Sequence, residues 1–113
     1  MHLAGKDGDS KPMQTPYYAV IFSARTHALD EEYQDVAKQM RELAAQQDGF
    51  LYFESVLEGD REISISYWRD LVAIEQWKQQ ADHQLAQQKG REKWYSSYQV
   101  RICKVEHDYN FNL

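Results

Sequence analysis

The stretch Arg61–Gly90, REISISYWRDLVAIEQWKQQADHQLAQQKG, decides which fold the sequence predicts. Its first part alternates apolar and small polar side chains, the two-residue period of a β-strand, with one face formed by Ile63, Ile65 and Tyr67. The chain then turns at Asp70, whose carboxylate can accept from the free amides of a first helical turn. Apolar residues continue at helical spacing at Leu71, Ile74 and Trp77. One segment thus predicts a strand, a tight turn and a capped helix.

The remaining elements place this segment in a β-α-β-β-α-β order. Three further strands are predicted over 17–25, 50–57 and 98–105 from their apolar, β-branched and aromatic residues. The first helix is predicted to begin after Asp30 and to end at Gly49, which readily adopts a left-handed conformation. A short hairpin turn is predicted over 58–60. This order is typical of an α+β, ferredoxin-like domain with both helices on one face of a four-stranded antiparallel sheet.

A chain of 113 residues is long enough for one domain with a hydrophobic core. We expect the folded domain to span residues 17–107. Residues 1–16 are polar and carry Gly and Pro, which predicts a disordered lead-in, and residues 108–113 are predicted to form a C-terminal tail. The segment 91–97 is predicted to be an irregular arm before the last strand.

Composition argues against several classes of function. The net charge of -5 argues against a nucleic-acid surface, which needs a basic stripe. The single cysteine, Cys103, allows no internal disulfide or cysteine metal cluster, and the four histidines lack metal-ligand spacing. No apolar run approaches the roughly 20 residues of a membrane span, and the first residues lack the apolar region of a secretory signal. A reducing cytoplasm is the simplest expected location.

The sheet face opposite the helices would display large apolar and aromatic residues from the first two strands. A patch of this kind is unusual on a monomer, so we expect a second copy of the chain to cover it in a homodimer. The alternative is that the arm at 91–97 and the C-terminal tail cover this face instead.

Aromatic side chains are the strongest candidates for a binding site. They come from the third strand, the second helix, the arm and the last strand, and the set is Tyr67, Trp68, Trp77, Trp94, Tyr95 and Tyr98. Aromatic residues with polar tips can hold a flat organic ligand by stacking and orient it by hydrogen bonds. Arg69 and Arg91 could orient an acidic substituent or form surface ion pairs. The alternative for each aromatic residue is a place in the core.

His83 is the candidate catalytic residue, because a histidine with a pKa near neutrality can accept a proton. On an unbroken helix, its spacing from Ile74 places His83 opposite the apolar stripe, in solvent. It enters a pocket only if the helix breaks between Gln79 and Asp82 and restarts. Both placements stay open at the level of sequence.

The stretch ISISYWRDLVAIEQWKQQADHQLAQQKGREKWYSSYQVRICKV resembles the antibiotic biosynthesis monooxygenase (ABM) family, and within it a small uncharacterised bacterial branch. The most specific positions are the turn at 68–70, Trp77, His83 and the pair Gly90-Arg91. The resemblance extends from Tyr17 to about Tyr109. It implies a ferredoxin-like protomer whose sheet packs on a partner's sheet to form a dimeric α/β barrel.

The resemblance implies more than one activity. Some relatives oxidise polycyclic phenols to quinones with O2 and without metal or flavin, so the leading hypothesis is a cofactor-free monooxygenase of an aromatic or quinol-type small molecule. Another branch binds and opens haem with an Asn on the first strand and a Trp and a His on the second helix. Here the first strand has no asparagine, so that set is not intact. A non-catalytic ligand-binding or stress-related dimer and a haem-binding relative are the alternatives.

Overall fold

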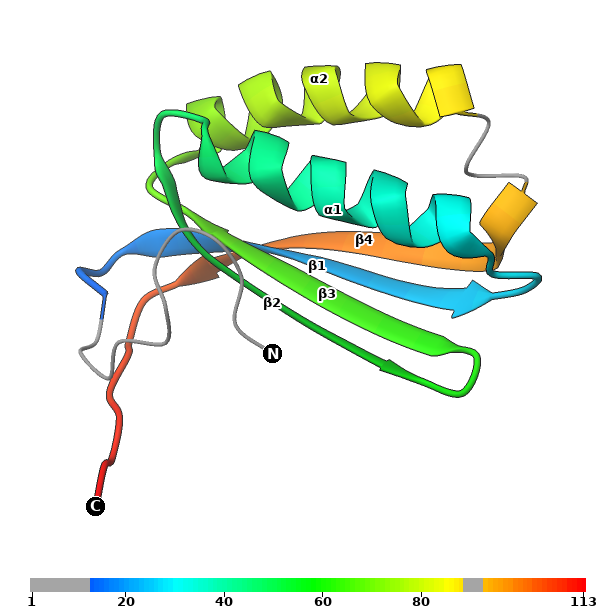
Figure 1. Cartoon of the computed structure of the whole chain (residues 1–113). Coiled ribbons are helices and arrows are strands. Elements are labelled where there is room, and N and C mark those ends of the chain that lie inside the picture. Colours follow the sequence, from blue (N-terminus) through cyan, green and yellow to red (C-terminus); the bar gives the residue numbers. More distant parts are fainter. Residues whose placement is uncertain (1–12, 89–92) are drawn as a thin grey trace.

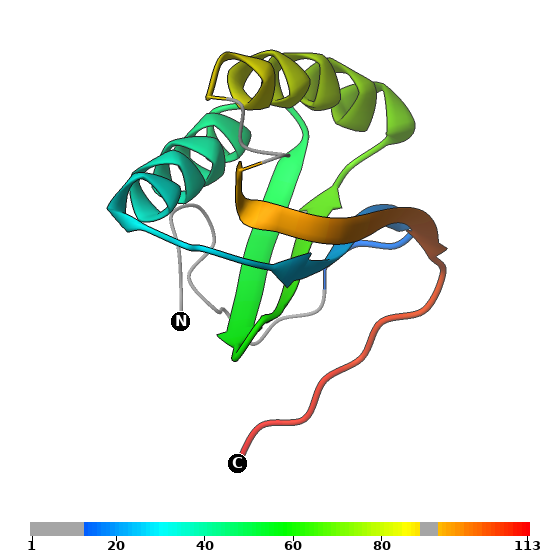
Figure 2. The same cartoon turned by 90° about the vertical axis from the view of Figure 1, so that its right-hand side faces the viewer.

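The helices and strands follow one another in the predicted order. The computed structural model describes residues 13–88 and 93–113, with the side chains of 83–88 outside that description. The elements are β1 (Tyr17–Thr26), α1 (Glu31–Ala45), β2 (Phe50–Glu58), β3 (Arg61–Trp68), α2 (Leu71–Gln88) and β4 (Tyr95–Val105). Figure 1 shows both helices on one face of the sheet, and Figure 2 shows the same two layers from the side. The ferredoxin-like fold is confirmed.

The four strands form one antiparallel sheet in the order β2-β3-β1-β4. Val20 in β1 lies opposite Ser66 in β3 and Ile102 in β4, and all three side chains face the helices. The next residue, Ile21, lies opposite Ile65 and belongs to the other face. This register fixes which side chains of each strand reach the space under the helices.

Both predicted helix caps are confirmed. The Asp30 side chain accepts from the Tyr33 amide at 2.9 Å, and the Asp70 side chain accepts from the Ala73 amide at 2.8 Å. Gly49, which follows α1, has a φ of 90° and therefore the predicted left-handed conformation. A Cβ atom at Gly49 would lie 2.6 Å from the Cβ of Ala73, so α2 packs directly on this turn.

Three sequence predictions need correction. Helix α2 runs without interruption from Leu71 to Gln88, so the break predicted as one option near 79–82 is absent. Leu71 is 53% exposed, and among the described side chains of α2 the buried ones are Ala73, Ile74 and Ala81. The irregular arm is shorter than predicted, because β4 begins at Tyr95, where the sheet continues past a register shift to pair with Thr26.

The core consists of two groups of buried side chains. One contains Val20, Ala44, Trp68, Ala73 and Ile74, and the other contains Tyr33, Val36 and Trp94. Members of both groups line a cavity between the helices and the sheet.

Residues 106–113 contain no helix or strand and extend away from the sheet (Figure 1). Near their start, the Asp108 carboxylate accepts from the Tyr17 hydroxyl at 2.6 Å and from the Met13 amide at 3.2 Å. The predicted lead-in at 1–16 lies largely outside the described residues. In the described part of the chain, neither helix combines the length and apolarity that crossing a bilayer requires.

Candidate functional site

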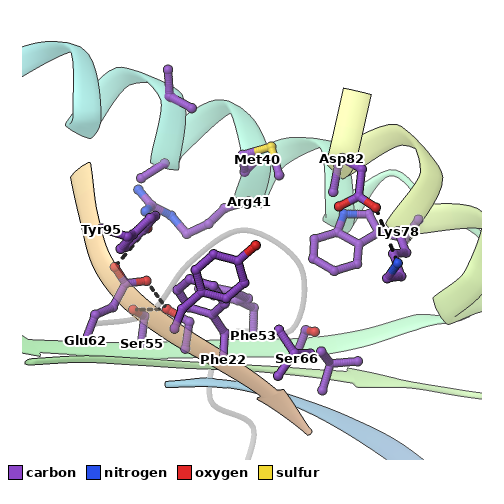
Figure 3. A pocket seen from close by; sticks show the side chains of 18 of the residues that line it. Phe22, Met40, Arg41, Phe53, Ser55, Glu62, Ser66, Lys78, Asp82 and Tyr95 are labelled. Carbon is purple, nitrogen blue, oxygen red and sulfur yellow. Dashed lines mark hydrogen bonds and ion pairs between the residues drawn. The ribbon is translucent and has the colours of Figure 1, made fainter. Parts of the chain in front are cut away.

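A cavity of about 230 Å³ lies between the sheet and both helices. Its walls are mainly apolar. The aromatic residues among them come from five of the six elements and from the short segment before β4: Phe22, Tyr33, Phe53, Trp77, Trp94, Tyr95 and Tyr98. Helix α1 contributes as well as α2, through Val36, Ala37 and Met40. The cavity therefore extends beneath the first helix as well as the second. Figure 3 shows the cavity from close by.

Four of the aromatic candidates line this cavity. They are Trp77 from α2, Trp94 from the segment before β4, and Tyr95 and Tyr98 from β4. Trp94 is also fixed in place, because its indole nitrogen donates to Asp30 at 3.1 Å. Trp68 is fully buried and does not border the cavity; its ring lies 5.3 Å from that of Trp77, so it supports that wall from behind.

Tyr67 and Arg69 were expected to bind ligand, and the structure places both outside the cavity. The strand alternation that directs Ser66 and Trp68 towards the helices turns Tyr67 to the other face, where its hydroxyl donates to Glu54 at 2.6 Å. Arg69 is exposed and forms ion pairs with Asp48 at 3.0 Å and with Asp70 at 3.2 Å. The surface ion pair weighed for Arg69 is thus present, whereas Arg91 lies outside the described residues.

His83 belongs to the continuous helix α2, and its side chain lies outside the described residues. The interruption on which its entry into the cavity depended is absent. That His83 acts as the catalytic base therefore stays a proposal.

Sequence reasoning missed a polar group at one end of the cavity, centred on Glu62. This carboxylate is only 7% exposed. Its Oε1 accepts from the hydroxyls of Tyr33 at 2.5 Å and Tyr95 at 3.2 Å, and its Oε2 accepts from Ser64 at 2.7 Å. A buried charge is tolerated when such hydrogen bonds replace its hydration. The available signal was that Glu62, two residues from Ser64, shares a strand face with the buried Trp68.

The surroundings of Glu62 also fix the protonation of the two tyrosines. Burial, and then the hydrogen bond and charge of Glu62, raise the pKa of Tyr33 above its ordinary value. Burial, and then the charge of Glu62, raise the pKa of Tyr95 in the same direction. Both hydroxyls consequently stay protonated and act as donors to the carboxylate at neutral pH.

The α2 end of the cavity has a different character. Lys78 and Asp82 border it and form an ion pair at 3.3 Å, on the side away from Glu62 in Figure 3. The indole nitrogen of Trp77 is buried there without a hydrogen-bond partner among the described residues. Among those residues, no three His, Cys, Asp or Glu side chains come together in a way that could hold a metal ion.

Residues 16–89 match the family described as antibiotic biosynthesis monooxygenase. The chain is 49% identical over 98 residues to the uncharacterised protein YqjZ of Bacillus subtilis, a match that covers 86% of both chains. It is 33% identical over 92 residues to the jasmonate monooxygenase ABM of Pyricularia oryzae. That match covers 78% of this chain but only 43% of the fungal protein.

Solved structures share the fold at low sequence identity. SnoaB, a cofactor-independent oxygenase from Streptomyces nogalater, superposes with a TM-score of 0.69 at 15% identity, over 83% of this chain and 97% of that one. NE2512, a protein of unknown function from Nitrosomonas europaea, gives 0.65 at 11% identity, over 86% and 96%. At such identities the likeness shows the architecture alone.

Proposed function

The chain belongs to the antibiotic biosynthesis monooxygenase family, and from this premise we propose that it is a cofactor-independent monooxygenase of an aromatic or quinol-type small molecule. The observation that supports this most is the cavity between sheet and helices, whose walls include two tryptophans and two phenylalanines. Flat apolar walls stack on an aromatic ligand and exclude water from it. A dry site of this kind suits a reaction in which the substrate itself reduces O2.

The proposed chemistry needs one proton acceptor and no further electron source. An anthrone or hydroquinone loses a proton, and the anion transfers an electron to O2. For an anthrone, the two radicals combine in a C–O bond, the peroxide anion takes the proton back from the base, and the hydroperoxide then eliminates water to leave a quinone. One oxygen atom of O2 enters the product and the other leaves as water. In this scheme Trp77 and Tyr98 hold the rings, and His83 is the proposed base.

We further propose that the working unit is a homodimer joined through the open face of the sheet, defined by Ile21, Val56, Ile63, Ile65 and Tyr67. On this face Val56 is 66% exposed and Ile63 is 39% exposed. Both helices lie on the opposite face, and residues 106–113 extend away from the sheet (Figure 1). A contiguous apolar face of this kind is typical of a surface covered by a partner.

The oxygenase proposal is tested by O2 uptake in an electrode chamber. The panel contains anthrone, a naphthohydroquinone and jasmonate, which is included because the name of the fungal relative mentions it. We expect an aromatic member to consume O2 well above the protein-free rate. Ala37→Trp fills the cavity from α1 and should abolish the excess, whereas Gln39→Trp, on the exposed side of the same helix, should leave it intact. No uptake above background with any aromatic member would contradict the proposal.

A further inference from the structure

Three hydroxyl groups donate to the carboxylate of Glu62, and a fourth contacts one of these three. Tyr33 and Tyr95 donate to Oε1, and Ser64 donates to Oε2. A hydroxyl has a single hydrogen, and Ser64 has already given its own to Glu62. Ser55 must therefore be the donor in the 2.8 Å contact between the two serines. Three hydroxyl hydrogens thus point to the charge, and the fourth points to the serine that holds it; Figure 3 shows Tyr95 and Ser55 on this chain of contacts around Glu62.

Around Glu62, the hydroxyl hydrogens are all in use, but the carboxylate oxygens can still accept a hydrogen bond. A carboxylate offers about four acceptor positions, and three protein hydroxyls occupy positions on Glu62. Oε2 has a single protein donor, so it can take one more hydrogen bond. A ligand carbonyl or carboxylate placed against the Glu62 oxygens would meet lone pairs and would lose its hydration there without replacement. The Glu62 carboxylate therefore selects a donor.

We propose that Glu62 anchors the substrate by accepting a hydrogen bond from a neutral hydroxyl group, and that the reacting end of the substrate lies at the opposite, α2 end of the cavity. This inference rests on the proposed function and assigns an orientation to it. The ligand class is a flat apolar compound with a hydroxyl group far from its reacting carbon. An ammonium group would also donate, but Arg41 borders the same cavity and its like charge opposes a cation.

The orientation follows from the charge of the anchor. The burial and the carboxylate that raise the pKa of Tyr33 and Tyr95 would act in the same direction on a phenol placed beside them. Such a phenol stays protonated, whereas the proposed oxygenation starts from an anion. The anion must form away from Glu62, towards the side of the cavity where α2 carries Lys78.

The test is a binding experiment under argon, so that no turnover takes part. Calorimetry measures the affinity of four naphthalenes that carry a hydroxyl, a methoxy, a carboxylate or an aminomethyl group at position 2. A hydrogen bond to a charged acceptor corresponds to roughly a ten- to hundredfold preference for the hydroxyl over the methoxy compound. In Glu62→Gln this preference should fall to within about threefold, because the charge is lost.

Glu54→Gln is the matched control. Glu54 also accepts from a tyrosine hydroxyl, at 2.6 Å, but on the other face of the sheet. This variant should keep the full preference for naphthol. If Glu62→Gln keeps the full preference for the hydroxyl over the methoxy compound, Glu62 is not the anchor. The proposal is also overturned if the original protein binds the carboxylate or the aminomethyl compound more tightly than the hydroxyl compound.

A spectroscopic readout separates anchoring from a purely structural role of Glu62. The absorbance of naphtholate reports the pKa of the bound naphthol, which we expect to lie above that of free naphthol and to return towards it in Glu62→Gln. A bound pKa below the free one would place the hydroxyl at the other end and overturn the orientation.

A folding check and a second variant keep the test decisive. If circular dichroism shows that Glu62→Gln does not fold, Ser64→Ala replaces it. This change removes the donor to Oε2 and should increase the naphthol preference, whereas an unchanged or smaller preference would overturn the anchor. If the protein prefers the hydroxyl over the methoxy compound but consumes no O2, the oxygenase function is overturned and the role of Glu62 in binding is not.

Discussion

Two tyrosine–glutamate hydrogen bonds of nearly equal length occupy very different surroundings in this protein. Tyr33 donates to Glu62 at 2.5 Å inside the cavity, and Tyr67 donates to Glu54 at 2.6 Å on the opposite, exposed side of the sheet. The chemistry of the two pairs is the same. Only the alternation of strand faces makes one of them part of a binding site and the other part of the open face.

At the same scale, His83 supplies the sharpest test of the proposed proton transfer. Replacing it with alanine should lower turnover roughly a hundredfold, the usual scale of a general base, while circular dichroism stays unchanged. His27, exposed in the loop before α1, is the control, and His27→Ala should keep full turnover. Turnover of His83→Ala within about threefold of the original would mean that the proton acceptor is another group.

The residues of the site were only partly predictable from the sequence. Aromatic residues stand out by type, and Trp77, Trp94 and Tyr98 do line the cavity. Tyr67 was misplaced, because alternation divides β3 into two faces without saying which one the helices cover. Glu62 was missed for the same reason: its role depends on Tyr33 and Tyr95, which only the fold brings beside it.

Among the elements, the features predicted correctly are those that depend on residues close in sequence. Asp30 and Asp70 cap helices through bonds to amides three residues away, and the turn after Glu58 joins neighbouring strands. The start of β4 was predicted late, because Tyr95 joins the sheet only through its pairing with Thr26, which is distant in sequence. Contacts between distant segments leave little trace in a local pattern.

The junction of α1, β2 and α2 gives a prediction at the scale of elements. Gly49→Ala should lower the free energy of unfolding by roughly 1–3 kcal/mol, because it combines a positive φ with a Cβ only 2.6 Å from that of Ala73. Gly59 also has a positive φ, but a Cβ there would meet nothing within 4 Å. The loss of unfolding free energy in Gly59→Ala therefore measures the cost of the backbone conformation alone. Urea unfolding measures both. Equal losses in the two variants would show that α2 does not pack tightly on this turn.

For the whole molecule, the open face of the sheet predicts the state of association. Light scattering at micromolar concentration should give about twice the 13.4 kDa of one chain, since an interface on the order of 1,200 Å² or more is expected. Ile63→Lys places a charge on the open face and should shift the mass towards one chain. Leu71→Lys, at an exposed apolar position on α2, should not. A monomer mass for the unaltered protein would contradict the homodimer.

The central claim is that the cavity lets a bound substrate reduce O2 without a cofactor. The most direct measurement is mass spectrometry of the product after reaction of the chelator-treated protein with anthrone under ¹⁸O₂. The proposed chemistry predicts one ¹⁸O atom in the quinone and one in water, at a rate that Ala37→Trp abolishes and Gln39→Trp preserves. Quinone formed at the protein-free rate, or formed equally fast with the cavity filled, would contradict it.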